Sequence, residues 1–504
     1  MKLFTLGITG TCSNNRGYSG AVLTPTALKT SWRSKIGSLL VFFIFGLAMF
    51  MPSNMNAQLP GFVDGNVTSN GQLDWEDVWK AQQTPPTATL PAGSITTGII
   101  FDGKAPDSIY TGGGTKDHLP INGATASQSW QWKTADGSSS DKTNIQEAGA
   151  ILIGGKIYFF GNKFAAEGTT TIGFWFFQDE VGAIANGRFS GEHQKGDILV
   201  VADIENGGAV GVIDAYKWVG DGEGTLPSST KSMVKISTTN GTLGAIVNTN
   251  PEITPWTHQS KAPAAANTMP PVTFFEGFID IAALTLNVNA CFSSFLVETR
   301  SSNPVTSILE DFTGGAFNVQ PKLDPIADIT ICAGDALGMI TAVANGGIAP
   351  LTYVWTVPSG ATNPGNVASF TPDKSGTYSV IVTGIGIGGL GTCPSDPVSA
   401  NVTINPKPAP TTSNLALCES GADNGTASFD LNNGVTNADG GTITFHTSQA
   451  FADAGTPTIS SPRVSSGETI YVRSYKASTG CYGTGSFTLT VNDNPDPLTT
   501  NLTL

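Results

Sequence analysis

Short apolar segments separated by turn residues recur along almost the whole chain after residue 58. Residues 151–153 and 157–160 flank a turn at Gly154-Gly155, and a second turn with Asn-Gly at its centre lies at 205–208. Such turns between apolar runs are typical of β-hairpins. Residues 171–177 are apolar enough for a buried central strand. Because no long stretch has a convincing 3.6-residue apolar period, the sequence predicts an all-β fold.

The spacing of the segments predicts three modules rather than one core, since single cores rarely grow to 504 residues. Residues 58–322 suit a large jelly-roll-type β-sandwich. Residues 323–406 and 407–494 each have the alternation and strand spacing of a seven-strand Ig-like β-sandwich. The predicted architecture is therefore a large sandwich followed by two Ig-like repeats.

The end of the chain resembles the start of the second repeat. Pro410–Leu417 precedes Cys418, and Pro497–Leu504 has a closely similar sequence at the chain terminus. This similarity predicts that residues 495–504 begin a further repeat that is truncated.

A secretory leader is predicted at residues 1–57. Arg33 and Lys35 precede an unbroken apolar stretch at 39–51, which is shorter than the ~20 residues that span a bilayer. A basic flank, a short apolar core and a small residue before the cut are typical of a signal peptide. Cleavage is expected near Ala57-Gln58. The mature chain is then secreted or on the cell surface, without a membrane span.

Composition narrows the possible partners. Charged residues make up 13% of the chain, the formal net charge is −14, and there are 60 glycines and 30 prolines. Abundant Gly and Pro fit many short strands joined by turns. No basic patch occurs, so a nucleic-acid partner is disfavoured on electrostatic grounds. Glycans or other surface proteins remain as partners.

Cysteine positions predict one disulfide in each repeat. Cys332 and Cys393 lie in the first repeat, and Cys418 and Cys481 lie at nearly the same separation in the second. Disulfides are permitted outside the cytoplasm. The economical pairing is Cys332 with Cys393 and Cys418 with Cys481. No Cys-x-x-Cys occurs, so zinc and redox catalysis are not indicated.

No catalytic motif emerges from the sequence. The string Gly384–Gly389 fits G-x-G-x-x-G, but no helix can follow it, so we expect a flexible loop rather than a dinucleotide site. The four histidines lack Cys or His neighbours at metal-ligand spacing. A glycosidase needs two facing carboxylates, and the sequence offers no pairing among Asp179, Glu180, Glu192 and Glu276. We therefore expect no catalytic residues and no cofactor, with calcium as the one possible ion.

The first module resembles a domain of large surface proteins in Bacteroidetes and Actinobacteria. The resemblance rests on segments such as Phe62–Asn66, Trp130-Gln131-Trp132, Gly173–Gln178 and Cys291–Ser302. It implies an N-terminal module that is similar in outline to lectin-like sandwiches. It also implies a second cysteine soon after Phe317-Asn318, which this chain lacks, so Cys291 is expected to have no partner.

A lectin-like module suggests candidate ligand residues. Oxygen ligands for calcium in turns and an aromatic platform for a sugar are the usual elements of such sites. The platform candidates are Trp130 and Trp132, and the calcium candidates are Asp64, Asn66, Asp117, Asp141 and Asn144. The structural alternative is that these Asp and Asn side chains form Asx-turns and that the two Trp residues alternate between core and surface.

The two repeats carry resemblances of their own. Tyr353-Val354-Trp355 and Gly376-Thr377-Tyr378 make the first resemble PKD and Ig-like repeats of bacterial surface proteins. Thr447–Ala450 and Thr479–Tyr482 make the second similar to a repeat of Bacteroidetes proteins linked to gliding motility and type IX secretion. Together these features predict an exported, non-catalytic adhesion or structural protein with a lectin-like head on an Ig-like stalk. The alternative is a carbohydrate-binding or carbohydrate-degrading protein with its site in the first module.

Overall fold

The computed structural model describes residues 62–111, 115–123, 125, 129–135, 139–205, 210–220, 232–238, 241–284, 290–336, 338–421 and 424–495. The predicted signal peptide lies outside these ranges. So does the truncated repeat predicted at 495–504, apart from Pro495, and so does most of the turn predicted at 205–208.

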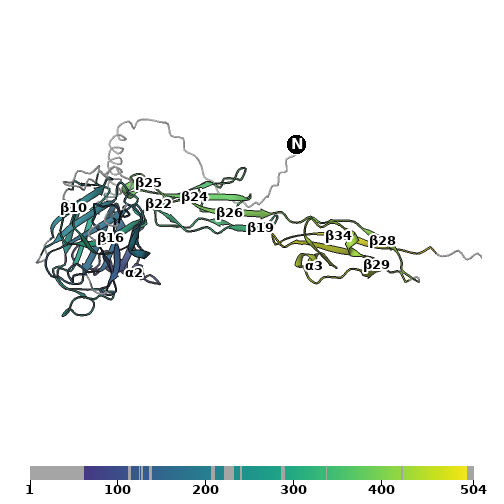
Figure 1. Ribbon diagram of the computed structural model, residues 1–504, viewed down its shortest axis with the longest axis horizontal. Helices are drawn as coiled ribbons and strands as arrows, with labels where there is room; N and C mark the ends of the chain where they lie inside the picture. Colours follow the sequence, from purple (N-terminus) through teal and green to yellow (C-terminus); the bar gives the residue numbers. More distant parts are fainter. Residues whose placement is uncertain are drawn as a thin grey trace, which may run out of the picture. The chain divides into compact units, whose positions relative to one another are not determined.

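Two antiparallel sheets form the first module (Figure 1). The five-stranded sheet has the order β1 (Ile95–Phe101), β4 (Ile145–Ile153), β5 (Lys156–Lys163), β15 (Phe274–Asp280), β12 (Leu243–Val247). The eight-stranded sheet has the order β11 (Met233–Lys235), β10 (Val210–Trp218), β9 (Ile198–Ile204), β6 (Thr170–Phe177), β16 (Ser294–Arg300), β17 (Leu309–Ala316), β2 (Asp107–Tyr110), β3 (Trp132–Ala135).

The central strands are buried on both faces. All eight residues of β5 and of β6 are buried. Side chains such as Phe159 and Phe174 pack between the two sheets, whereas Phe160 and Trp175 pack on the outer faces. A strand that is buried on both faces has a continuous apolar run rather than alternation. This explains the predicted run at 171–177.

The predicted hairpin at Gly154-Gly155 is confirmed. β4 and β5 pair in antiparallel register from Ile153↔Lys156 outward. Both glycines have positive φ, of 56° and 90°, which favours glycine and matches the twist of a two-residue hairpin.

Short elements complete the first module. They are α2 (Trp75–Ala81), the pair β7 (Gly182–Ile184) and β8 (Arg188–Ser190) around η2 (Ala185–Gly187), and the pair β13 (Glu252–Ile253) and β14 (Thr268–Met269). Asp74 caps α2, and Trp75 and Val78 pack on the outer face of the five-stranded sheet with Phe160.

Two smaller sandwiches follow, and their main sheets share one topology (Figure 1). The first has the order β19 (Ile329–Cys332), β26 (Val398–Asn405), β24 (Gly376–Ile385), β22 (Ile348–Thr356), with β25 (Thr392–Pro394) also on β24. The second has the order β28 (Leu415–Cys418), β34 (Cys481–Asn492), β33 (Glu468–Lys476), β31 (Thr442–His446). In both, the first strand of the sheet pairs in parallel with the last.

Short pairs and turns complete these modules. In the first they are β18 (Lys322–Leu323) with β21 (Ala344–Asn345), β20 (Ile340–Thr341) with β23 (Ser369–Phe370), and η3 (Ile387–Gly389). In the second they are β27 (Thr411–Thr412) with β30 (Val435–Asn437), β29 (Ala427–Phe429) with β32 (Arg463–Ser465), η4 (Leu431–Gly434) and α3 (Gln449–Ala454).

An aromatic anchor in the first of these modules is typical of Ig-like folds. Tyr378 is fully buried, and its hydroxyl donates to the backbone oxygen of Lys374 at 2.9 Å, as in a tyrosine corner. The predicted fold class, an all-β chain with a large sandwich and two Ig-like sandwiches, is confirmed. Over the described residues, no helix has the length and apolar character needed to cross a membrane.

Candidate functional site

Both disulfides join one module to the next. Cys291, which precedes β16 of the large sandwich, is bonded to Cys393 in β25, with 5.4 Å between the Cα atoms. Cys332, at the end of β19, is bonded to Cys481, at the start of β34, with 5.6 Å between the Cα atoms. The two bonds therefore link the three modules in series.

The pairing predicted from the sequence, Cys332 with Cys393 and Cys418 with Cys481, is wrong. In register, Cys332 is opposite Asn405 and Cys393 is opposite Gly384, at the other end of the same sheet. At ~3.3 Å per residue these positions are roughly 35 Å apart along the strands. A disulfide needs Cα atoms within about 7 Å, so the two cysteines cannot pair.

The same geometry separates the cysteines of the second repeat. Cys418 is opposite Asn492, the last residue of β34, whereas Cys481 is the first residue of that strand. Cys418 is exposed and is the free cysteine of the part of the chain that the structure describes. The expectation that Cys291 has no partner is also wrong, because its partner lies in the next module.

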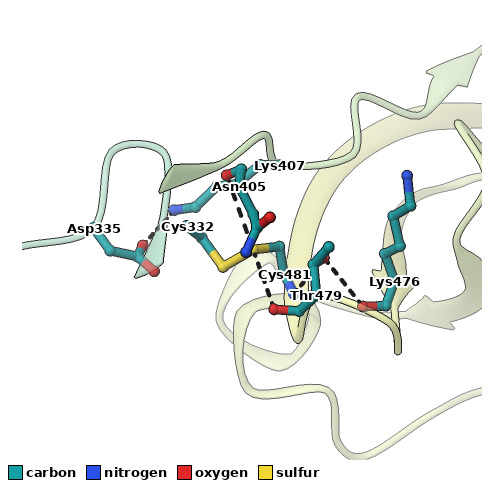
Figure 2. Close-up of a disulfide and its surroundings, with 7 residues drawn as sticks. All are labelled: Cys332, Asp335, Asn405, Lys407, Lys476, Thr479 and Cys481. Carbon is teal, nitrogen blue, oxygen red and sulfur yellow. Dashed lines mark hydrogen bonds and ion pairs between the residues drawn. A yellow bond between two sulfur atoms is a disulfide. The ribbon is translucent and has the colours of Figure 1, made fainter. Parts of the chain in front are cut away.

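Polar contacts surround the second disulfide (Figure 2). Asp335 and Lys407 form an ion pair of 2.6 Å, and Cys481 Sγ lies 4.0 Å from the backbone oxygen of Asn405. The proline-rich linker 406–410 packs against Gly483, where a Cβ atom would collide with the backbone oxygen of Pro408. The linker is thus held by close backbone contact in addition to the disulfide.

The first junction is apolar. Ile387, in η3, and Cys393 are fully buried and belong to the same core as the interior of the large sandwich. A Cβ atom on Gly388 would lie close to Ala282, and Gln320 donates to the backbone oxygen of Pro394 at 2.7 Å. The segment 384–389 is therefore a packed turn that docks on the sandwich, and the expected flexible loop is wrong.

A groove of about 790 Å³ lies beside this junction, along residues 312–316 of β17. Asp102 and Ser108 line it where β17 pairs with β2, and Lys322 and Asn345 line it near the other end of the strand. Its walls are about equally polar and apolar, with small residues such as glycine, serine and alanine prominent and with Phe101, Leu296 and Phe312 among the apolar ones. Such walls offer both apolar contact and hydrogen-bonding groups to a ligand.

The two tryptophans do not form a binding platform. Trp130 is fully buried, and its indole N–H donates to the backbone oxygen of Lys116 at 3.0 Å. Trp132 is partly buried, and its indole N–H donates to the backbone oxygens of Ile184 and Arg188. Trp130 packs edge-to-face on Trp175 in the outer core of the eight-stranded sheet. Its role is packing.

Two of the predicted calcium ligands form Asx-turns. Asp64 accepts from the backbone N–H of Asn66 at 3.2 Å, and Asn66 accepts from the backbone N–H of Thr68 at 3.0 Å. The same turn donates the backbone N–H groups of Asp64 and Gly65 to Glu276, a buried carboxyl that also accepts from Trp75 Nε1. Desolvation raises the pKa of Glu276 to about 8. This residue therefore anchors the turn and does not face a cleft.

The other predicted ligands have different partners. Asp117 is buried beside Arg300, with 2.7 Å between Arg300 Nη1 and Asp117 Oδ2, and it accepts from Trp175 Nε1 at 2.8 Å. Asp141 is paired with Lys104 and Lys261. Asn144 is buried and donates to Asp107 Oδ2 at 2.8 Å. Apart from Asp64 and Asn66, which share one turn, the predicted ligands thus belong to separate local networks.

Arg300 has a second buried partner, Glu298, two residues earlier on β16. Gly173 on β6 faces this pair, and a Cβ atom there would collide with the carboxylate of Glu298. Desolvation raises the pKa of Glu298 to about 8, against the opposing effect of Arg300. This network is structural, and sequence reasoning missed it because Asp117 and Gly173 are far from Glu298 and Arg300 in the chain.

Sequence reasoning also missed a group of carboxylates at one end of the groove. Asp102, Asp107 and Asp311 each place a carboxylate oxygen within 4.8 Å of the others. No local spacing motif marks this group, since the three residues come from β2, from β17 and from the residue after β1.

A family model matches the last module. Residues 414–495 match the Flavobacterium inter-domain disulphide bond domain. No curated protein matches the chain. Similar solved structures include a titin I9–I11 tandem, with 10% identity over 56% of this chain and 93% of that one and a TM-score of 0.19. A SusE-like surface located polysaccharide binding protein of Bacteroides thetaiotaomicron has 9% identity over 80% and 69% of the two chains and a TM-score of 0.16.

Proposed function

We propose that the chain is an exported, non-catalytic surface protein whose three modules are fixed in series by disulfides between consecutive modules. The observation that carries this proposal is the pair of bonds Cys291–Cys393 and Cys332–Cys481. Disulfides of this kind persist in oxidising compartments, which agrees with the apolar leader segment at 39–51. In this proposal the Ig-like modules carry the large sandwich away from the cell.

The match of residues 414–495 to the Flavobacterium inter-domain disulphide bond domain supports the proposal. Fixing the junctions limits the relative motion of neighbouring modules, which suits a stalk. The link to gliding motility and type IX secretion, implied by the resemblance of the second repeat, stays a prediction.

Labelling of Cys418 tests the proposed location and the disulfide pairing together. Cells that produce the chain are treated with a membrane-impermeant maleimide before or after lysis, and unreduced peptides are analysed by mass spectrometry. We expect label on Cys418 of intact cells, because this thiol is exposed and has no disulfide partner among the described residues, and none on the four bonded cysteines. The Cys418→Ser variant is the control and should take up no label. Label that appears only after lysis would contradict a surface location.

The second candidate function is glycan binding in the groove along β17. The groove's size and its mixture of apolar and hydrogen-bonding groups favour it. We expect the full chain to bind one class of polysaccharide on a glycan array. Ala316→Trp should weaken binding at least tenfold, because Ala316 is exposed within the groove lining. Ala266→Trp, at an exposed position outside this lining, is the matched control, and equal loss in both variants would argue against the groove.

A further inference from the structure

Three aspartates meet where the two sheets of the large sandwich come together. Asp102 directly follows β1 of the five-stranded sheet, Asp107 begins β2, and Asp311 lies in β17 of the eight-stranded sheet. One carboxylate oxygen from each lies within 4.8 Å of the other two. Asp107 and Asp311 are fully buried, and Asp102 is partly buried.

Neutral donors satisfy only part of this group. Asp107 Oδ2 accepts from Ser139 and Asn144, each at 2.8 Å. Asp311 accepts from the backbone N–H groups of Ile145 at 2.6 Å and Phe312 at 2.8 Å. These donors orient the carboxylates without neutralising them.

Two buried oxygens of the group lack any hydrogen-bond partner. They are Asp107 Oδ1 and Asp102 Oδ2. The basic residue closest in sequence, Lys104, is paired with Asp141 instead. Within the described residues, no lysine, arginine or histidine forms an ion pair with Asp102, Asp107 or Asp311. A buried charge needs a partner, and among the described residues these carboxylates have no basic side chain as a counterion.

Burial raises the pKa of all three carboxyls, to about 7 for Asp102. Repulsion from neighbouring carboxylates adds to this effect for Asp102 and Asp311. Because carboxylate oxygens of all three residues lie within 4.8 Å of one another and two buried oxygens have no donor, the group must either share protons or bind a cation. Protons or a bound cation would each reduce the repulsion among the three carboxylates, and a direct measurement of cation binding distinguishes the two.

The spacing and the ligand type together favour calcium. Calcium binds oxygen at about 2.3–2.6 Å, so two oxygens on one calcium ion are at most about 4.6–5.2 Å apart. Magnesium, at about 2.0–2.1 Å, limits the separation to about 4.2 Å and requires near-octahedral geometry. Separations of up to 4.8 Å fit the calcium sphere without rearrangement. An all-oxygen ligand set also disfavours zinc and copper.

We propose that Asp102, Asp107 and Asp311 bind a calcium ion that ties the two sheets of the large sandwich together at one end of the groove. Asp102 also lines the groove. The remaining coordination positions are therefore open to water or to the oxygen of a ligand in the groove. This site is separate from the turns at Asp64 and Asp141 that the sequence suggested.

The test uses the full chain after treatment with a chelator. Calcium chloride is titrated by calorimetry, and thermal unfolding is followed in calcium, in magnesium and in chelator. We expect calcium to raise the unfolding midpoint of the large sandwich and magnesium to have little effect. With free calcium at 100 times Kd, the folding equilibrium constant should rise about 100-fold. Neither readout requires a glycan or a cell surface, so failure here is distinct from failure of the proposed function.

The variant Asp107→Asn should lose the response to calcium, because it removes one charge and one unpartnered carboxylate oxygen. Asp141→Asn is the matched control, since Asp141 is an aspartate of the same module held by two lysines, and it should retain the response. The proposal would be overturned if the wild-type chain releases no heat with calcium and has the same unfolding midpoint in calcium as in chelator. This outcome does not depend on whether the variant folds. An unchanged calcium response in Asp107→Asn would also overturn it.

Discussion

Replacing Arg300 with methionine should lower the free energy of unfolding of the large sandwich by about 3–5 kcal/mol. Arg300 is 1% exposed and lies between two carboxyls that are both fully buried, Asp117 and Glu298. The variant keeps the length of the side chain but leaves both carboxyls without a counterion. Removing one partner of a buried ion cluster is costly because the remaining charge cannot return to water.

The matched control is Arg463→Met. Arg463 is bonded to Glu468 through its Nε at 2.7 Å and its Nη2 at 3.0 Å, but the two side chains are 32% and 25% exposed. Water screens such a pair, so the control should cost only about 0–1 kcal/mol. Urea unfolding of each variant, followed by circular dichroism, measures both values, because this signal reports the strands of the last module as well as those of the large sandwich. A cost for Arg300→Met no larger than that of the control would contradict a buried charge network.

Local pattern was sufficient to predict the fold class and the hairpin of β4 and β5. The sequence Gly154-Gly155 indicates the geometry of the turn, because positive φ at two successive positions favours glycine. The continuous apolar run at 171–177 likewise reflects burial on both faces. In both cases the physical cause lies within a few residues of the signal.

The sites could not be predicted because their members meet only through tertiary structure. Asp102 and Asp311 are brought together by the packing of the two sheets, and no spacing rule connects them. Trp130 is an aromatic residue of the kind found in sugar platforms, yet a covering layer on the eight-stranded sheet buries it. Residue type suggested the chemistry, whereas burial determined the role.

The predicted disulfide pairing was wrong for a different reason. Equal cysteine spacing in two repeats fits a bond within each repeat, and it fits equally well a bond from each module to the next. Strand direction decides between these two pairings. β19 and β28 run parallel to the last strands of their modules, β26 and β34, so Cys332 and Cys418 lie beside the C-terminal ends of those strands. The unpaired cysteine of the first module, Cys291, was the signal in the sequence that favoured the shifted pairing.

Cutting the linker between the two Ig-like modules should leave them covalently joined. We expect that a site for a sequence-specific protease, inserted within residues 406–410, is cleaved without separating the fragments on a non-reducing denaturing gel. The bond between Cys332 and Cys481 spans the cut, and reductant should release the fragments. Pairing within each repeat predicts the opposite, because no bond would then cross residues 406–410.

Variants identify the responsible bond. The double variant Cys332→Ser/Cys481→Ser should release the fragments without reductant, whereas Cys291→Ser/Cys393→Ser, which removes the other junction bond, should keep them joined. The first variant should also lose up to about 5 kcal/mol of stability, the chain-entropy contribution of a bond that closes a loop with a sequence separation of 149 residues. Fragments that separate in the cleaved wild-type chain before reduction would rule out the covalent series of modules on which the proposed stalk depends.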